Sequence, residues 1–299
     1  MGVRGLQNFI RQYSEPRSLE DLLDPKNQKQ KIGIDISFYL YRWQGDIERI
    51  LKFIKSLQEN KHHVILAFDG RAEDGKMWEA QRRRDAREVE LQSANKILDM
   101  LETEDLSDEQ RFMLERKAAE HQKRGWSLTK EVRHAIKERF YIEKIPMVKA
   151  QGEADGLLAS MSARGDLDIV ISGDMDLLAM GARILWTPLE DCIHYREYNR
   201  DGILQELGMS DWQFRSLCAM CFTETSQEQN NFNIQQAYQM LKVFRSLTVL
   251  KQKYPHWLTV WPDDAHIFYR PVDRVEPWIR DDQLVIYKAF MNYQIMPYE

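Results

Sequence analysis

Acidic residues follow three short apolar runs in this chain, each at the point where the run ends. KIGID ends on Asp35, VILAFDG reaches Asp69, and DIVISGDMD reaches Asp174 and Asp176. Continuous apolar runs of this length are typical of buried parallel strands, whose carboxyl ends meet at one edge of a sheet. One aspartate at a strand end is most often a turn former or helix cap. Three strands that end alike predict an acidic crevice.

Two more acidic residues, Glu153 and Asp155, lie in AQGEADGLLA, where a loop enters a predicted helix. Acidic side chains also favour helix N-termini by charge alone, so this pair is weaker evidence by itself. Clustered carboxylates repel one another unless a cation neutralises them, and carboxylate oxygens suit Mg²⁺. So many acids predict two ions about 3.5–4 Å apart, an arrangement that supports in-line phosphoryl displacement. We therefore expect a phosphodiesterase that uses two Mg²⁺ ions, for which Mn²⁺ can substitute.

Basic residues follow the second acidic strand on a predicted helix. Lys76 and Arg83 are seven positions apart and so share one helix face, while Arg82, Arg84 and Arg87 extend the basic surface. Lysine and arginine commonly stabilise the charge of a transferring phosphoryl group. We expect Lys76 and Arg83 to be catalytic cations beside the acids; the alternative is a solvated basic face.

Histidine and cysteine offer no competing site. His62, His63 and His134 lack the spacing of metal ligands, and we expect them at the surface. Cys218 and Cys221 form a C-x-x-C without a second pair, which favours buried thiols over zinc ligands. The cysteine content cannot build a disulfide framework, which indicates a reducing compartment, the nucleus or the cytoplasm.

The elements that must position these residues read as an α/β protein. Predicted strands cover residues 31–36, 64–68, 145–148, 168–171 and 183–186, with helical patterns between them. Such alternation predicts a parallel central sheet flanked by helices. We expect a core over residues 1–200 and a helical C-terminal region over residues 201–299. A Gln- and Asn-rich patch at 227–239 is expected to be a loop.

One stretch departs from this alternation. Residues 75–140 are charged and poor in glycine and proline, which predicts two or three inserted helices. Ser107 and Gln110 have the spacing of a capping box after a break in the helical pattern. The simplest interpretation of the insertion alone is a solvated helical hairpin without a role.

Composition sets wide limits. The 299 residues are 43% hydrophobic and 30% charged, as in an ordinary soluble protein. The sequence has no apolar run of the roughly 18 residues a membrane span needs and no signal-peptide core, so we expect no membrane contact. A net charge of −5 argues mildly against nucleic acid, but the distribution of charge matters more. We expect a monomer.

Taken in order, these motifs resemble the flap endonuclease/XPG family of structure-specific 5′ nucleases. MGVRGLQNFI resembles the family's N-terminal helix, GIDISFYLY its first acidic motif, and AFDG, GEADGLLA and SGDMDLLAMG the next three. LQELGMSDWQFRSLCAM resembles the stretch before the last acidic residue. The resemblance runs from Met1 to about Lys242. Each motif is modest alone, but five in family order are a specific signal.

The resemblance implies a role for each matching residue. The implied ligands are Asp35, Asp69, Glu153 and Asp155 for the first metal ion, and Asp174 and Asp176 for the second. Lys76 and Arg83 match a basic pair at the base of a helical arch, so residues 75–140 correspond to the arch around a single-stranded 5′ end. Tyr41 matches an aromatic residue that stacks on a base near the cut. The segment from Gly2 would lie where the duplex arms bend.

The chain departs from the family at two places near its C-terminal region. Glu224, in Phe222-Thr223-Glu224-Thr225, stands where the family has a seventh metal-binding aspartate and is one methylene longer. Asn231-Phe232-Asn233 replaces two glycines of a helix-hairpin, which predicts a degenerate element with a weaker grip on duplex DNA and a weaker monovalent cation site. Residues 283–290, QLVIYKAF, lack the aromatic pair of a sliding-clamp peptide, so we do not expect clamp binding.

Three functions remain open from the sequence. The leading one is a Mg²⁺-dependent 5′ nuclease, endonuclease or exonuclease, acting on flap, nicked or 5′-ended DNA in replication, repair or recombination. A ribonuclease on the same scaffold is the second. A catalytically silent nucleic-acid-binding scaffold is the third, and the retention of six acidic residues argues against it.

Overall fold

The computed structural model describes residues 3–70, 77–221 and 232–254. Its centre is a seven-stranded sheet in the order β1-β7-β6-β5-β2-β3-β4. The strands are β1 (Glu15–Ser18), β2 (Lys31–Asp35), β3 (His63–Phe68), β4 (Met147–Lys149), β5 (Ile169–Ile171), β6 (Ile184–Pro188) and β7 (His194–Asn199). Strands β4, β3, β2, β5 and β6 are mutually parallel. The five predicted strands and the parallel α/β fold are thus confirmed.

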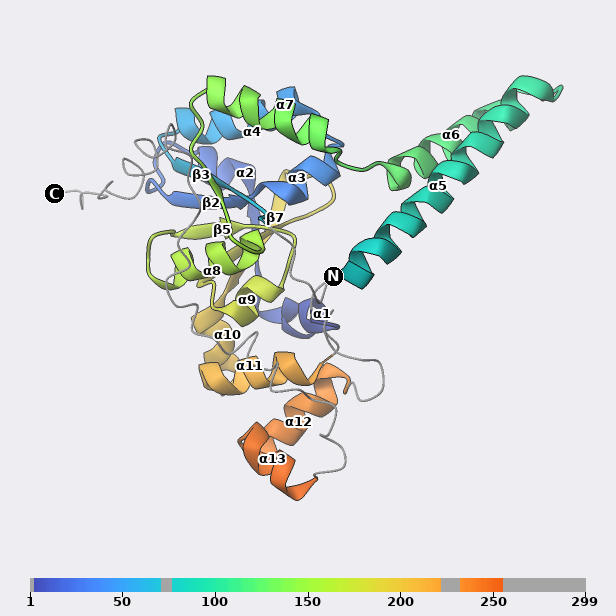
Figure 1. Cartoon of the computed structure of the whole chain (residues 1–299). Coiled ribbons are helices and arrows are strands. Elements are labelled where there is room, and N and C mark those ends of the chain that lie inside the picture. Colours follow the sequence, from blue (N-terminus) through green and yellow to red (C-terminus); the bar gives the residue numbers. More distant parts are fainter. Residues whose placement is uncertain (1–2, 71–76, 222–231, 255–299) are drawn as a thin grey trace.

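Helices cover both faces of the sheet (Figure 1). One face carries α2 (Leu19–Leu23), α3 (Ile36–Arg42), α4 (Ile47–Glu59) and α7 (Lys130–Ile142). The other carries α1 (Leu6–Ile10), α8 (Ala154–Ala163), α9 (Asp176–Met180), α10 (Arg200–Leu207) and α11 (Asp211–Met220). The central parallel strands β2, β3 and β5 are buried on both sides, which explains why their sequences are continuously apolar.

The central strand β2 shows how closely these layers pack. Ile32 and Ile34 face the α3–α4 side, while Gly33 faces α8. A Cβ atom at Gly33 would lie 2.5 Å from the Leu167 side chain and 2.7 Å from that of Leu158. Glycine therefore lets α8, which carries two of the predicted acids, approach the sheet closely.

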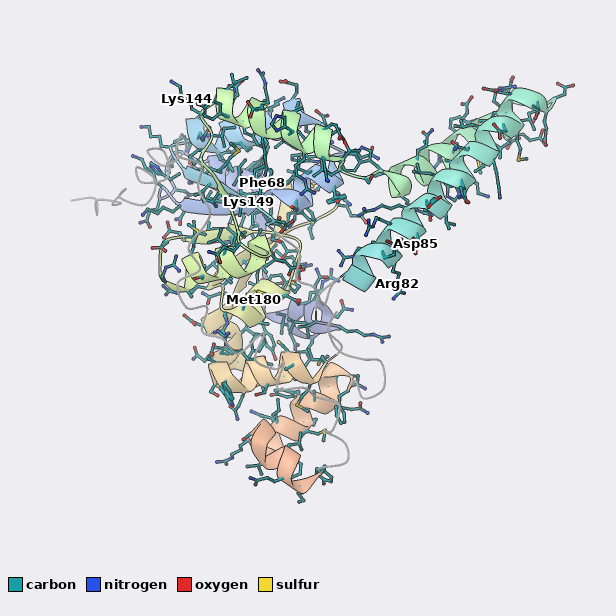
Figure 2. All side chains as sticks on the ribbon, viewed as in Figure 1. Phe68, Arg82, Asp85, Lys144, Lys149 and Met180 are labelled. Carbon is teal, nitrogen blue, oxygen red and sulfur yellow. The ribbon has the colours of Figure 1, made fainter. Side chains whose placement is uncertain are left out.

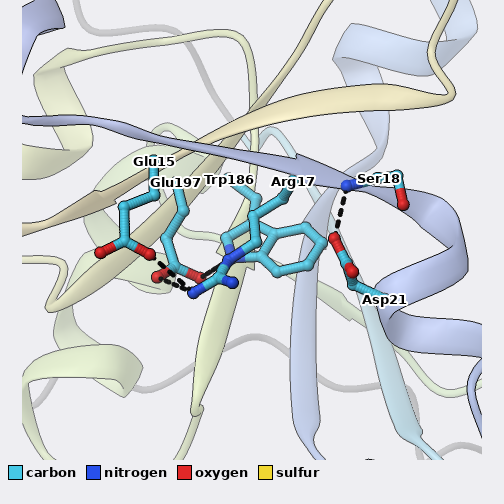
Figure 3. Close-up of polar contacts among 6 residues, drawn as sticks. All are labelled: Glu15, Arg17, Ser18, Asp21, Trp186 and Glu197. Atoms are coloured by element: carbon cyan, nitrogen blue, oxygen red, sulfur yellow. Dashed lines mark hydrogen bonds and ion pairs between the residues drawn. The ribbon is translucent and has the colours of Figure 1, made fainter.

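Two strands escaped the sequence prediction because neither is an apolar run. β1 and β7 are antiparallel at one end of the sheet, and β1 contains Pro16, a residue confined to strand edges. A polar network joins them (Figure 3): Arg17 donates to both Glu197 oxygens at 3.2 and 3.0 Å, and the Trp186 ring nitrogen donates to Glu197 at 2.6 Å. Long-range pairing, rather than local pattern, makes these strands.

The insertion forms a pair of long helices that stands away from the body (Figure 1). We call α5 (Met77–Thr103) and α6 (Asp108–Gly125) the arm. Ala94, Ile97 and Ala118 are buried in the arm, and the predicted capping box is present, with Gln110 N donating to Ser107 Oγ at 3.3 Å. With α7, the inserted segment has the helices that the sequence predicts.

In the described part of the chain after β7 the regular elements are all helices, as expected; the last two are α12 (Ile234–Phe244) and α13 (Leu247–Lys253). The predicted loop over 227–239 is wrong in its second half, because α12 begins at Ile234. Asn233 caps it: its side chain accepts from Gln236 N at 2.9 Å, and Gln236 returns a bond to Asn233 N. Asn233 has a φ of −68°, so it needs no glycine-like conformation, while Asn231 lies outside the described residues.

Two further expectations concern single residues. Cys192, Cys218 and Cys221 are buried, as predicted. His62 was predicted at the surface and is buried: its Nδ1 accepts from Gln30 N at 3.0 Å, and its Nε2 contacts Leu22 O at 2.5 Å. The ring joins β3 to the loop before β2, a contact that sequence spacing does not reveal. No described helix has the length and apolar character to cross a membrane.

Candidate active site

The predicted acids lie at one edge of the sheet because three neighbouring parallel strands end there. β2 lies between β3 and β5 and ends at Asp35. Asp69 directly follows β3, and Asp174 follows β5 after Ser172 and Gly173. The carboxyl ends of parallel strands are where α/β proteins bind ligands. The topology of the sheet therefore brings these side chains to the same edge.

Two serine hydroxyls orient the acids of β2 and β3. Asp35 accepts from Ser37 N and from the Ser172 hydroxyl, each at 3.0 Å. The Ser37 hydroxyl donates to Asp69 at 2.7 Å, and the other Asp69 oxygen accepts from Ala154 N at 3.0 Å. Ser37 thus joins Asp35 to Asp69, and Asp69 reaches the first turn of α8.

The first turn of α8 carries the second predicted pair. Glu153 is the N-cap residue and Asp155 lies in the first turn, so the positive end of the helix dipole favours both charges. One Asp155 oxygen is buried and has no hydrogen-bond partner within the structure. An unpartnered buried carboxylate oxygen is costly, so this atom calls for a cation or a proton.

The charges of these acids act on one another. Burial, followed by the charges of Asp35, Asp174, Asp69 and Glu153, raises the pKa of Asp155 well above its ordinary value. Burial and Asp69 raise the pKa of Asp35 to about 7, against the opposing hydrogen bonds from Ser172 and Ser37. Five of the predicted ligands are therefore electrostatic neighbours.

Asp174 and Asp176 sit where β5 runs into the short helix α9. Asp174 N donates to Ser172 Oγ at 3.1 Å, and Asp176 N donates to Asp174 Oδ1 at 2.9 Å. Asp176 is the first residue of α9, and its carboxylate accepts from Val3 N at 2.6 Å. The start of the described chain thus reaches this edge of the sheet; Gly2, predicted to contact nucleic acid, lies outside the described residues.

The acidic side chains lie near one another but do not converge on a single metal position. Within the described ranges, no three His, Cys, Asp or Glu side chains are arranged so that they could hold an ion as they stand. Several of their oxygens are turned toward Ser37, Ser172 and backbone amides instead. A shared ion would require these carboxylates to rotate. Glu224, the doubtful seventh acid, is outside the described residues.

A second group of predicted residues lies where the arm meets α3. Tyr41 is on α3 with 40% of its surface exposed. The Arg87 guanidinium lies 5.1 Å from the Tyr41 ring centroid, and the Trp126 ring meets the same ring edge-on at 5.7 Å. Such a cluster offers an exposed aromatic face beside a cation. Trp126, which follows α6, had no sequence signal as a site residue.

The remaining basic residues lie on the first turns of α5. Arg82, Arg83 and Arg84 are exposed, and Figure 2 shows Arg82 and Asp85 near the end of the arm that adjoins the body. Asp85 accepts from Gln81 at 2.7 Å, an i,i+4 contact along the helix. Lys76, predicted to act with Arg83, lies outside the described residues.

Sequence reasoning missed Ser37 and Ser172 as partners of the acids. Both lie two residues from an aspartate, in D-I-S and S-G-D, but serine at that spacing is common in turns. Only the fold reveals that the Ser172 hydroxyl meets an aspartate 137 positions away.

Part of this chain matches a family model, and its sequence is similar to those of flap endonucleases. The XPG I-region model matches residues 144–224, which include Glu153, Asp155, Asp174 and Asp176. Flap endonuclease 1 of Entamoeba dispar is 24% identical over 276 residues, covering 84% of this chain and 70% of that protein. Flap endonuclease 1 of Glycine max is 26% identical over 243 residues, covering 74% of this chain and 60% of that protein.

Solved structures share the fold at low sequence identity. The catalytic core of Rad2 in complex with DNA substrate superimposes with a TM-score of 0.62 at 16% identity, covering 97% of this chain and 94% of that one. Human GEN1 in complex with Holliday junction DNA gives 0.59 at 13% identity, with coverage of 97% and 72%. Flap endonuclease-1 from Methanococcus jannaschii gives 0.54 at 19%, with coverage of 94% and 86%.

Proposed function

We propose that this chain is a member of the flap endonuclease/XPG family and that it is a metal-dependent, structure-specific 5′ nuclease that hydrolyses phosphodiester bonds in DNA. The observation that carries the proposal is the group of mutually interacting carboxylates at the carboxyl edge of the sheet. A site of this kind, beside an arm with a basic and aromatic base, suits phosphoryl chemistry on a nucleic acid strand.

The donor set fits divalent cations. The buried, unpartnered Asp155 oxygen and the raised pKa of its carboxyl, caused by burial and by the charges of Asp35 and Asp174, are what a cation would relieve. Hard oxygen donors favour Mg²⁺, with Mn²⁺ as a substitute. In the proposed assignment the first ion takes Asp35, Asp69, Glu153 and Asp155, and the second takes Asp174, Asp176 and Glu224. When bound, the ions supply Lewis-acid stabilisation of the phosphoryl oxygens.

The chain's own residues have distinct proposed tasks. Ser37 and Ser172 orient the carboxylates of Asp69 and Asp35, respectively, by hydrogen bonds from their hydroxyl groups. Arg83, with Lys76, would bind the scissile phosphate from the start of α5. Tyr41, held beside Arg87, would stack on a base at the foot of the arm, and Arg82 and Arg84 would contact the backbone.

The substrate is proposed to be DNA with a free 5′ end, such as a flap or a nick. Of the solved structures named above, the Rad2 core is in complex with DNA substrate and human GEN1 with Holliday junction DNA, and this chain shares their fold. Single-stranded RNA is the alternative, because the element expected to grip duplex is degenerate. We further propose that residues 1–200 form the nuclease core, that residues 201–299 assist it, and that the protein acts as a monomer in a reducing compartment, the nucleus or the cytoplasm. We do not expect it to bind a sliding clamp.

A substrate panel tests the proposal. Cleavage of matched 5′-labelled flap DNA, nicked DNA, blunt duplex DNA and single-stranded RNA is measured with Mg²⁺ and with Mn²⁺. We expect flap or nicked DNA to be cut fastest with either metal. Asp176→Ala is expected to reduce cleavage by roughly a thousandfold or more while DNA binding stays within a few-fold, because the carboxylate acts on the reaction and not on the duplex. Cutting of RNA alone would overturn the DNA assignment.

A further inference from the structure

Helix α9 begins with a proposed metal ligand, but it is too short to be stable without contacts to other elements. It contains five residues, from Asp176 to Met180, and the preceding loop carries Asp174. Isolated helices of this length are unstable in water, so contacts with neighbouring elements must hold it. Whatever holds the far end of α9 also sets where Asp174 and Asp176 face.

A buried arginine from another element contacts that far end. Arg200, the first residue of α10, is 6% exposed and donates from Nε to Leu178 O at 2.7 Å. Leu178 lies in the last turn of α9, where a positive charge is favourable, and its carbonyl also accepts from Gly181 N at 3.2 Å. Arg200 thus adds a second, charged donor at the carboxyl end of the helix.

Two residues of α11 hold Arg200 in place. Asp211 accepts from the Arg200 guanidinium and, through its other oxygen, from Arg215 Nε at 2.8 Å. The Phe214 ring lies 5.6 Å from the Arg200 guanidinium. Arg215 also closes on α9, because a Cβ at Gly181 would be 3.0 Å from its guanidinium nitrogen. Asp211 therefore joins two buried arginines behind the acidic crevice.

This arrangement of charges would be energetically unfavourable if its only role were to fill space in the core. Two arginine side chains that are 7% and 10% exposed share one aspartate side chain that is 52% exposed, and apolar side chains of similar volume often fill the space of buried charges at least as well.

We propose that Arg200 is a positioning residue: held by Asp211, it fixes the carboxyl end of α9 and thereby the direction in which Asp174 and Asp176 face the crevice. The proposal rests on the function proposed above only in taking these two acids as metal ligands. Arg200 contacts neither substrate nor metal and acts through the helix. Its loss should therefore loosen α9 and weaken the metal site more than it affects DNA binding.

Two variants of Arg200 and one of its anchor test this. Arg200→Lys keeps the charge but loses the guanidinium fork, Arg200→Met removes both, and Asp211→Asn leaves Arg200 without its charged anchor. Arg17→Met is the control, because Arg17 is also paired to carboxylates but has a side chain that is 36% exposed and joins the edge strand β1 to β7 (Figure 3). If Arg200→Met does not fold, Arg200→Lys and Asp211→Asn decide.

Three readings are taken on each variant: hydrogen exchange of amides in residues 172–183, Mg²⁺ binding by calorimetry, and flap cleavage against Mg²⁺ concentration. For Arg200→Met we expect exchange about tenfold faster and Mg²⁺ binding about tenfold weaker, as for other groups that orient ligands. The rate should recover at saturating Mg²⁺, and the KM for DNA should stay within about twofold. Arg200→Lys and Asp211→Asn should change in the same direction by less, and Arg17→Met should match the wild type.

Unchanged α9 exchange and unchanged Mg²⁺ binding in the Arg200 and Asp211 variants would overturn the positioning role. Equal effects in Arg17→Met would overturn it too, because they would reflect general destabilisation. A wild-type protein that cuts no substrate would overturn the proposed function instead, and the exchange data would still decide the role of Arg200.

Discussion

At the scale of single residues, Asp155 gives the clearest indication that the site accommodates a cation or a proton. Its buried oxygen has no partner, and its neighbours are other carboxylates. A fold selected for stability alone would not keep such a residue, because an unpaired buried charge destabilises the folded state. Stability and activity should therefore change in opposite directions at this position.

Asp155→Asn tests that trade-off. Burial and nearby charges raise the pKa of Asp155 in the folded state, so the folded protein binds its proton more tightly than the unfolded chain does. Stability then falls as pH rises above the unfolded pKa, about 4. In metal-free buffer at pH 7 we expect the variant to be more stable by about 1–3 kcal/mol, a gain that shrinks toward pH 4. Denaturant unfolding across this pH range measures it; a less stable variant at pH 7 would contradict the assignment.

Ser172→Ala tests the orientation of the carboxylates. The Ser172 hydroxyl donates to Asp35 and accepts from Asp174 N, so its removal frees two predicted ligands at once. We expect flap cleavage to fall by about 10- to 100-fold. Ser162→Ala is the control, since Ser162 is equally buried and accepts from Arg183 N away from the acids. Similar losses in both variants would indicate general destabilisation.

The sequence revealed the acids but not their partners. Asp35, Asp69 and Asp174 could be predicted because strand ends are local features of an apolar pattern. The Ser172–Asp35 bond and the Arg200–Leu178 bond join residues 137 and 22 positions apart, so only the fold brings them together. The burial of His62 was missed for the same reason.

At the scale of elements, the arm is the feature that departs most from the sheet and the helices that cover it (Figure 1). α5 and α6 pack through small and apolar residues, and Gly125 lies against Leu91 near the body. A Cβ at Gly125 would be 2.6 Å from Leu91 Cγ and 3.2 Å from Arg87 O. Arg87 also contacts Tyr41, so close packing here fixes the foot of the arm.

Gly125→Val should separate the two helices at that foot. Overpacking of this kind typically costs about 1–3 kcal/mol, here confined to the arm. We expect 5′-flap cleavage to fall by roughly tenfold through displacement of Arg87 from Tyr41, with little change in metal dependence. Phe112→Ala, on the exposed surface of α6 away from this contact, is the control and should cut normally. Kinetics on flap DNA at saturating Mg²⁺ compares them, and equal rates in both variants would contradict this role of the foot.

Elements with a strong local pattern were predicted and those without one were not. The five parallel strands and the inserted helices follow from apolar runs and a capping box. β1 and β7 are polar strands joined by the cross-strand ion pair of Arg17 and Glu197. The start of α12 lies in a Gln- and Asn-rich stretch whose cap, Asn233, resembles loop sequence.

At the scale of the whole molecule, one apolar cluster continues from the sheet into the helices after residue 201. Leu241 of α12 is fully buried in the same cluster as Phe214 of α11 and Leu178 of α9. The helices that follow the sheet therefore share its core.

Leu241→Ala tests this continuity. Removing a buried leucine side chain costs about 2–5 kcal/mol where the surroundings cannot collapse. We expect the single unfolding transition of the whole protein to shift to lower denaturant, detected alike by circular dichroism and by tryptophan fluorescence. A separate early transition that leaves the main one unmoved would contradict a shared core.

The central claim is that the acids at the sheet edge form a metal-dependent nuclease site. The most direct measurement is the rate of 5′-flap DNA cleavage as Mg²⁺ is titrated, in the wild type and in Asp155→Asn side by side. We expect a rate that rises with Mg²⁺ to saturation in the wild type and is lower by about a thousandfold or more in the variant at every concentration. Cleavage by the wild type in a chelator, or full activity of Asp155→Asn, would contradict the account.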